Sequence, residues 1–222
     1  MATKKAYGIL ALLALFGILV FMFFNDRILN ILGYLNIPLE LRKIKLLENM
    51  YIDIVGALVP IVFSLILSRY LFFREKLPKM YLLGILFSSV GSLKFSKVDS
   101  NGITIEYIFI DIFIAILCFF IVYLPRWIKL YRESLHEIKN NFLISFSVAY
   151  IYASISALIT DLLYLPSMDF NEYIGGMGFG DGIFLSALFV GLPLIFLISF
   201  TELLSFYTFD TALRKNVSQN KN

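Results

Sequence analysis

The sequence predicts an all-α protein, a polytopic transmembrane helical bundle of about six spans with short interfacial amphipathic helices. Of its 222 residues, 59% are hydrophobic and only 16% are charged, whereas a soluble domain is nearer half apolar and a quarter charged. The apolar residues are also gathered into runs, and most of these approach the roughly 17–25 residues that a membrane span needs. We therefore expect a single integral membrane domain over residues 1–222.

The predicted spans, in chain order, are about residues 6–24, 51–73, 80–93, 107–124, 143–165 and 181–207. The first follows the basic start MATKK and is long enough to cross a bilayer, so we expect a retained span and not a cleaved signal peptide. The third is short and contains Gly84 and Gly91. It is expected to be tilted, broken or partly re-entrant.

Two segments between the spans mix leucine and isoleucine with basic residues, which is typical of amphipathic stretches lying in the membrane interface. One is residues 26–49, which Pro38 divides, and the other is residues 125–141, with Trp127 and Tyr131 at headgroup depth. The dipeptide Asn101-Gly102, between the third and fourth spans, predicts a turn.

The distribution of lysine and arginine predicts the orientation. Both termini, the loop after the second span and the loop after the fourth are basic, which places them in the cytoplasm by the positive-inside rule. The loop 166–180 has no lysine or arginine and falls outside. Arg27, Arg42, Lys43 and Lys45 would also lie outside, where an interfacial helix can hold them. We expect a multi-pass protein of the cell membrane with cytoplasmic N- and C-termini.

The composition also excludes several classes of function. The net charge is only +3 and no acid-poor basic run occurs, so we expect the lipid bilayer and no nucleic acid as a partner. Cys118 is the only cysteine, which leaves no disulfide framework and no thiolate metal cluster. His136 is the only histidine and lies in a basic loop, which excludes a rhomboid-type serine protease and a HExxH zinc protease.

Two aspartates border the loop between the fifth and sixth spans, and they are the most informative residues of the chain. Asp161 lies about 6 Å below the end of the fifth span, and Asp181 opens the sixth from the same side. Charged groups within spans are rare and are functional-site candidates by default. Two carboxylates that share a low-dielectric site cannot both ionise easily, so one can act as general base on water and the other as general acid toward a carbonyl.

The glycines around Asp181 admit two interpretations. Gly178, Gly180 and Gly182 remove side chains there, so an extended substrate could approach closely. The same spacing, with Gly176/Gly180 and Gly178/Gly182 as small-xxx-small pairs, also packs membrane helices together. At this point both alternatives stay open.

GFGDGIFLSALFVG, residues 178–191, resembles the GxGD segment of presenilins and signal peptide peptidases, and ISALITDLLYLP, residues 155–166, resembles the preceding presenilin span. This resemblance implies an intramembrane aspartyl protease with Asp161 and Asp181 as the catalytic pair, Gly178, Gly180 and Gly182 at the substrate, and no metal or cofactor. Its substrates would be membrane-spanning or membrane-proximal polypeptides.

A second resemblance covers more of the chain. VGALVPIVFSL, VDSNGITI, AYIYASISALITDLL and IGGMGFGDGIFLSALFVG, in this order over roughly residues 49–195, resemble an uncharacterised family of small prokaryotic multi-pass membrane proteins. That resemblance implies an architecture and no activity.

Three further acids lie in or near the spans. Asp53 and Glu202 are close to predicted ends, where snorkelling to water would explain them, and Asp111 could contact Lys94 or Lys97. Several buried acids together also favour a rival function, a proton- or cation-coupled carrier with broken helices at GALVPIV and FVGLPLIF.

A non-catalytic assembly protein is the third alternative. In it, Asp161 and Asp181 would merely bond to backbone or to tyrosine hydroxyls such as those of Tyr150 or Tyr164. The sequence does not indicate the oligomeric state.

Overall fold

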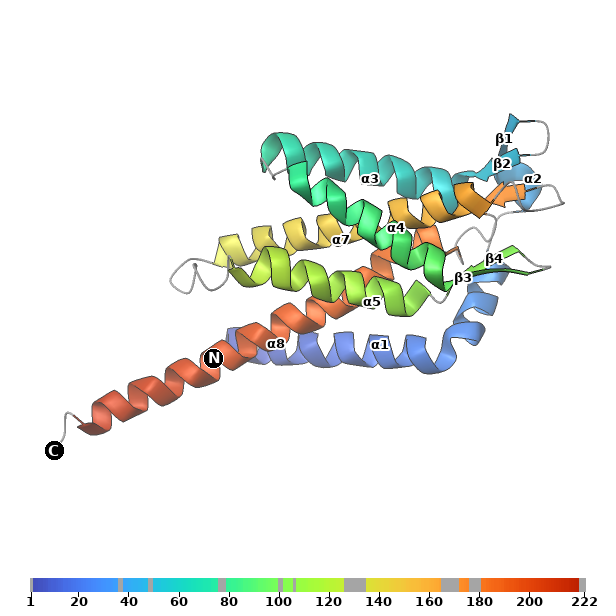
Figure 1. Ribbon diagram of the computed structural model, residues 1–222. Coiled ribbons are helices and arrows are strands. Elements are labelled where there is room, and N and C mark those ends of the chain that lie inside the picture. The colour runs from blue at the N-terminus through green and yellow to red at the C-terminus, as the bar shows by residue number, and fades with distance from the viewer. Residues whose placement is uncertain are drawn as a thin grey trace.

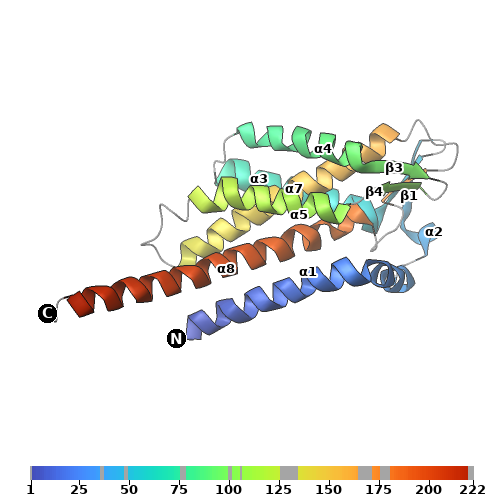
Figure 2. The same ribbon diagram turned by 60° about the horizontal axis from the view of Figure 1, so that its bottom comes forward.

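The structure is a computed structural model that describes residues 2–35, 38–47, 50–75, 79–99, 102–105, 107–125, 135–164, 172–175 and 181–219. Long helices run side by side, and the strands lie together at one end of the bundle (Figures 1 and 2). Helix α1 begins, and helix α8 ends, at the opposite end. The ends of the bundle therefore differ in structure: one carries the strands, and the other carries the start of α1 and the end of α8.

Six helices of more than ten residues make up the bundle in the described ranges: α1 (Ala2–Leu35), α3 (Val59–Arg69), α4 (Leu83–Phe95), α5 (Tyr107–Cys118), α7 (Leu135–Tyr164) and α8 (Gly182–Gln219). Shorter helical segments adjoin them: α2 (Leu39–Arg42), the π-helical segments η1 (Ile54–Leu58), η2 (Tyr70–Arg74) and η4 (Phe119–Tyr123), and the 3₁₀ segment η3 (Lys79–Leu82). Segments η1 and η2 lengthen α3 at its two ends, and η4 lengthens α5.

Four stretches of helix are long and apolar enough to cross a membrane: Lys5–Phe24, Ile54–Arg74, Asn140–Tyr164 and Gly182–Tyr207. They match the first, second, fifth and sixth predicted spans closely. The helices at the other two predicted spans, Leu83–Phe95 and Phe109–Tyr123, are apolar but shorter. At 1.5 Å per residue α4 is only about 20 Å long, less than the roughly 30 Å hydrocarbon core. That these two helices cross the membrane stays a prediction.

The first predicted span ends where α1 bends. Phe24 has non-helical backbone angles, φ −123° and ψ 19°, and the helix resumes beyond it to Leu35. Polar residues Asn25 and Asp26 follow directly. The bend therefore separates the membrane-length apolar helix from a second helical piece, which agrees with the amphipathic helix expected after the first span.

The described residues also form five short strands, which the prediction of a helical bundle did not include. They are β1 (Lys43–Leu47), β2 (Met50–Asp53), β3 (Ser96–Asp99), β4 (Gly102–Ile105) and β5 (Glu172–Ile174). Strands β1, β2 and β5 form one sheet in that order, with β1 antiparallel and β5 parallel to β2. Strands β3 and β4 form an antiparallel hairpin that flanks the predicted Asn101-Gly102 turn. Of that turn, Asn101 lies outside the described residues.

After Pro38, the predicted amphipathic stretch 26–49 thus has a single helical turn, α2, and then a strand, β1, where a helix was expected. Its basic and apolar residues follow one another as Lys43, Ile44, Lys45, a period of two that suits a strand with unlike faces. Pairing with β2 stabilises it, as in Lys43 opposite Asp53 and Lys45 opposite Tyr51. Of the other predicted interfacial stretch, 126–134 lies outside the described residues, and α7 begins at Leu135.

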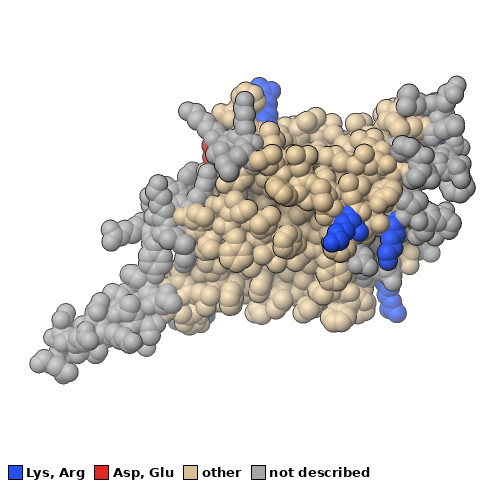
Figure 3. All heavy atoms as spheres, viewed as in Figure 1, with Lys and Arg blue, Asp and Glu red and all other residues tan. Residues whose placement is uncertain are grey.

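Helix α7 occupies the centre of the bundle, in contact with α3, α4, α5 and α8, while α1 packs along α8 at the outside (Figure 2). Small hydroxyl side chains join α7 to its neighbours: Ser154 lies 2.6 Å from Ser64 of α3, and Ser92 of α4 donates to Ser156 at 3.4 Å. Such residues allow membrane helices to approach closely. The face of the molecule in Figure 3 has a broad middle zone without charged side chains.

Candidate carboxylate site at the strand end of the bundle

The two predicted aspartates lie close enough for their charges to interact. Asp161 is three residues before the end of α7, and Asp181 directly precedes α8. Both residues are only partly buried. The antiparallel course of α7 and α8 (Figure 1) therefore places the two carboxylates at the same end of the bundle, where the strands are.

Asp181 caps the N-terminus of α8. Its Oδ1 accepts a hydrogen bond from the backbone N–H of Ile183 at 2.9 Å, and its carbonyl accepts the first helical bond from Leu185 at 2.9 Å. Aspartate is among the best residues for this position because it satisfies backbone donors that the first turn leaves without partners. The cap fixes Asp181 relative to α8.

Gly175 holds the other aspartate. Its backbone N–H donates a hydrogen bond to the carboxyl group of Asp161. Gly175 has φ +74°, and a Cβ there would lie 2.6 Å from both Cβ and N of Ala57. Only glycine meets both conditions without strain, since the left-handed region is costly for other residues and no space is left for a side chain. The loop after β5 is thus pressed against η1 and bonded to α7.

A buried ion pair supports η1 from the sheet side. Asp53 is 0% exposed, and its Oδ1 accepts the N–H groups of Val55 at 2.8 Å and Gly56 at 2.9 Å. Its Oδ2 lies 2.7 Å from Nε of Arg42, which is also buried. The expectation that Asp53 snorkels to water is wrong, because the ion pair and the two cap bonds compensate the carboxylate inside.

A small apolar cluster lies beside these polar groups. It joins β2, η1, α7, β5 and α8 through the buried residues Ile52, Ala57, Ala157, Ile174 and Ile183. Ala157 is one turn before Asp161 on α7, and Ile183 is two residues after Asp181. The cluster therefore fixes the five elements that carry the candidate site.

The remaining acids are buried as well. Glu202 is 5% exposed and accepts a hydrogen bond from the hydroxyl of Tyr123 at 2.7 Å, so the expectation of snorkelling is wrong for it too. Asp111 is 0% exposed, and neither of its oxygens has a hydrogen-bond partner within the described ranges. The predicted contact with Lys94 or Lys97 is therefore not formed.

The glycines of the GxGD segment fall on both sides of the described boundary. Gly178 and Gly180 lie outside the described residues, as does most of the loop 166–180. Gly182 is the first residue of α8 and is partly buried. Tyr164, an alternative partner for the aspartates, donates its hydroxyl to the carbonyl of Leu93 at 3.2 Å.

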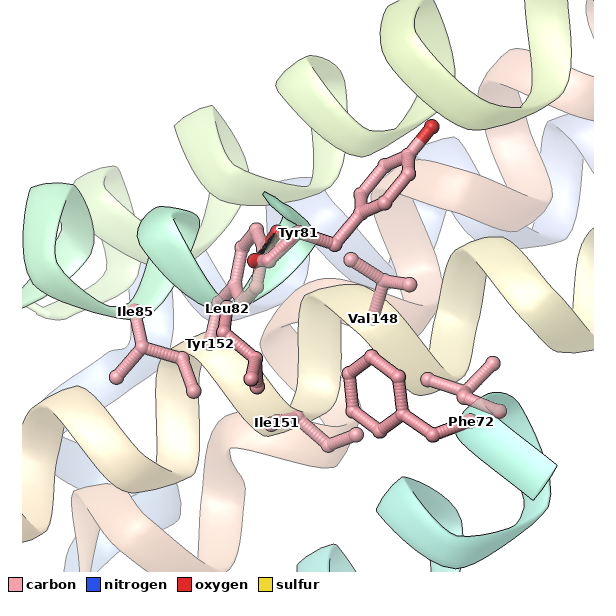
Figure 4. Close-up of a pocket in the computed structure, with 8 residues that line it drawn as sticks. Phe72, Tyr81, Leu82, Ile85, Val148, Ile151 and Tyr152 are labelled. Atoms are coloured by element: carbon pink, nitrogen blue, oxygen red, sulfur yellow. Dashed lines mark hydrogen bonds between the residues drawn. The ribbon is translucent and has the colours of Figure 1, made fainter. Parts of the chain in front are cut away.

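A small pocket lies elsewhere, between η2, η3, α4 and α7 (Figure 4). Its lining is almost wholly apolar and includes Leu71 and Phe72 of η2 and Val148 and Ile151 of α7. Tyr152 reaches across to donate a hydrogen bond to the carbonyl of Tyr81. The pocket contains none of the carboxylates and is not part of the candidate site.

Arg42 and Gly175 are the site residues that the sequence did not reveal. In the sequence, Arg42 is one of several basic residues of an expected interfacial stretch. Gly175 opens a Gly-Gly pair after an apolar strand residue, which is a turn signal. That signal was available, although it does not indicate that the N–H of Gly175 points at Asp161.

The fold and the site define a mainly helical protein with four helices of membrane-crossing length and a pair of interacting carboxylates beside a small sheet. Residues 25–192 match a family described as "Protein of unknown function (DUF1614)", and the chain belongs to that family. No curated protein and no solved structure matches the chain. The match is consistent with the resemblance to an uncharacterised family, and none of the comparisons supports the resemblance to presenilins.

Proposed function

We propose that this protein hydrolyses peptide bonds of membrane-spanning or membrane-proximal polypeptides through Asp161 and Asp181. The observation that supports the proposal most is that the carboxyl groups of these two residues interact at the ends of neighbouring antiparallel helices. Paired carboxylates of this kind are the machinery of aspartic proteases, in which one group is ionised and the other holds a proton.

In the proposed reaction, Asp181 takes a proton from water while the water oxygen attacks the peptide carbonyl carbon. Asp161 donates its proton to the carbonyl oxygen, giving a neutral tetrahedral diol. Asp181 then passes its proton to the amine nitrogen as the C–N bond breaks, and a hydroxyl of the diol returns a proton to Asp161, which yields a carboxylic acid and an amine and restores the pair. The N-terminus of α8 favours a negative charge at Asp181, which suits the base. A protonated carboxyl group keeps an oxygen that can accept a hydrogen bond. Asp161 can therefore hold the proton and still accept the N–H of Gly175.

Strand β5 offers a place for the substrate backbone. In the part of the chain that the structure describes, β5 is an edge strand of its sheet, and it ends one residue before Gly175. Edge strands present backbone N–H and C=O groups that can pair with an added strand. We propose that an extended stretch of substrate pairs there, which would bring its peptide bonds to the two carboxylates.

We further propose that all six predicted spans cross the membrane and that both termini are cytoplasmic. In this topology the basic loops and both termini lie on the cytoplasmic side of the membrane, and the aspartate pair lies near the outer side. The helices at the third and fourth spans are short for a full crossing, so local thinning of the bilayer or flanking strands would have to complete them.

The test is cleavage of transmembrane peptides by the purified full-length protein in lipid nanodiscs, followed by mass spectrometry. Wild type should give defined products, and Asp161→Asn and Asp181→Asn should each lower the rate by at least about 10²-fold, because general acid–base groups contribute about 10²–10⁴-fold. Asp161→Ala is a second variant that lacks the proposed proton donor, and it should lose activity as well.

Glu202→Gln is the matched control, because it neutralises a buried carboxylate that lies about 30 Å from Asp181 along α8. It should cleave as wild type does. Absence of cleavage by wild type, or cleavage by both aspartate variants at the wild-type rate, would rule out the protease proposal.

A proton- or cation-coupled carrier is the second candidate, favoured by the carboxylates that are buried away from the pair, Asp111 and Glu202. A carrier predicts proton flux in liposomes that changes with Asp111→Asn. The protease proposal predicts no such change.

A further inference from the structure

Asp111 has the least compensated carboxylate among the described residues. It is 0% exposed, and both of its oxygens lack a hydrogen-bond partner there. Burying an ionised carboxylate without a counter-charge is prohibitively costly, so a group in this position must bind a positively charged species. Asp53, by comparison, is equally buried and has Arg42 at 2.7 Å.

Among the side chains that the structure describes, those of the neighbouring helices supply no counter-charge that reaches Asp111. Helix α5 packs against α4, α7 and α8. The lysine of α4, Lys94, has an exposed side chain. On the other two helices, the acids whose side chains the structure describes are engaged elsewhere, with Asp161 beside Asp181 and Gly175, and Glu202 bonded to Tyr123.

The remaining titratable groups near α5 are neutral hydroxyls and a thiol. Tyr150 bonds Ser186, and Tyr152 donates to the carbonyl of Tyr81. Cys118, two turns after Asp111 on its own helix, is a buried free thiol. Each is a weak acid that carries no positive charge.

A second observation concerns the stretch of α8 at the same depth. Helices α5 and α8 both start at the strand end of the bundle (Figure 1), and the bond from Tyr123 to Glu202 fixes their register. Asp111 comes twelve residues before Tyr123, and Val190 comes twelve residues before Glu202. Because twelve residues span about 18 Å of helix, Asp111 and Val190 lie at about the same depth. Pro193 lies within α8 nearby. Because proline has no N–H, the carbonyl of Phe189 loses its helical donor.

We propose that Asp111 binds a small monovalent cation, a proton or a sodium ion, in the interior of the bundle, at about the level of Pro193 in α8. A carboxylate oxygen and a backbone carbonyl without its helical donor are both ligands for sodium and acceptors for a proton. This site is separate from the Asp161–Asp181 pair and does not depend on peptide hydrolysis.

The sodium form is tested on the full-length protein in nanodiscs, by thermal unfolding in sodium chloride and in choline chloride at equal ionic strength, with ²²Na binding as the direct readout. If sodium is the ligand, wild type binds it and unfolds at a higher temperature in sodium chloride. Asp161→Asn, the matched control with another aspartate neutralised, should keep both effects. Asp111→Asn should lose both.

The proton form is tested by infrared spectroscopy, which detects the C=O stretch of a carboxylic acid that is absent from a carboxylate. If sodium has no effect, the acid band of wild type at neutral pH should include a contribution from Asp111, and Asp111→Asn should lose that contribution while any band from Asp161 remains. Asp111→Glu, which retains a carboxyl group, should retain the band at a shifted frequency. If Asp111→Asn does not fold, the band can be assigned with ¹³C-labelled aspartate. The carboxyl group at position 111 then carries the label in wild type and lacks it in Asp111→Glu. The proposal is overturned if wild type neither responds to sodium nor shows an acid band from Asp111.

Discussion

Nε of Arg42 lies 2.7 Å from Oδ2 of Asp53, and both side chains are buried at the junction of the sheet and the bundle. Arg42 ends α2, and Asp53 ends β2 and caps η1. Segment η1 in turn contacts Gly175, which bonds Asp161. The ion pair therefore supports the candidate site although neither residue belongs to the aspartate pair.

Replacing Arg42 alone should be strongly destabilising. Arg42→Met leaves the Asp53 carboxylate buried without its counter-charge, and breaking one side of a buried pair typically costs about 3–5 kcal/mol. The double variant Arg42→Met/Asp53→Asn should recover much of this loss, because asparagine retains an oxygen that can accept the bonds from Val55 and Gly56. Thermal unfolding in detergent measures both. Equal stability of the single variant and wild type would contradict a buried, compensating pair.

Gly175→Ala should damage the site more than the helices. An alanine at φ +74° costs about 1–2 kcal/mol, and its Cβ would overlap Ala57. The displaced loop would then no longer donate to Asp161. Gly91→Ala is the control, because a Cβ at Gly91 meets nothing within 4 Å, and it should leave stability unchanged or slightly higher. Hydrogen exchange at residues 172–175 reports the change, and unaltered protection in Gly175→Ala would contradict this account.

The sequence predicted the long helices well, because hydrophobic runs of membrane length depend little on tertiary context. The end of the first span at residue 24 coincides with the bend at Phe24. The proximity of Asp161 and Asp181 could also be predicted, since a short loop between antiparallel helices leaves few other arrangements. Gly178 and Gly180 lie outside the described residues, and their predicted role stays a prediction.

The strands and the buried acids could not be predicted in the same way. Strand β5 has three residues and depends on pairing with β2, a partner more than a hundred residues away in sequence. The burial of Asp53 and Glu202 depends on Arg42 and Tyr123, whose positions only the tertiary fold determines. The sequence shows only that these acids are near the ends of predicted spans. Snorkelling to water is the default expectation for a charged residue there.

Gly84 should be indispensable for the packing of α4 on α7. A Cβ at this position would overlap the ring of Tyr152, whose hydroxyl bonds the carbonyl of Tyr81 (Figure 4). Overpacking of this kind costs about 1–3 kcal/mol, so Gly84→Ala should lower the unfolding temperature. Adding Tyr152→Leu removes the overlapping ring and should cancel part of the loss in a double-mutant cycle. Purely additive effects would show that the two positions do not touch.

Tyr123→Phe should destabilise the end of the bundle opposite to the strands. The hydroxyl of Tyr123 donates to Oε1 of Glu202 at 2.7 Å, and both residues are buried. Removing the donor leaves a buried carboxylate oxygen without this bond, which typically costs about 1–3 kcal/mol. Glu202→Gln is the milder change, because the amide oxygen can still accept the hydroxyl proton. Thermal unfolding should therefore rank wild type and Glu202→Gln above Tyr123→Phe. Peptide cleavage should be nearly unaffected by either variant, because Asp181 lies about 30 Å away along α8. A loss of cleavage in Glu202→Gln with unchanged stability would instead assign Glu202 a part in the function.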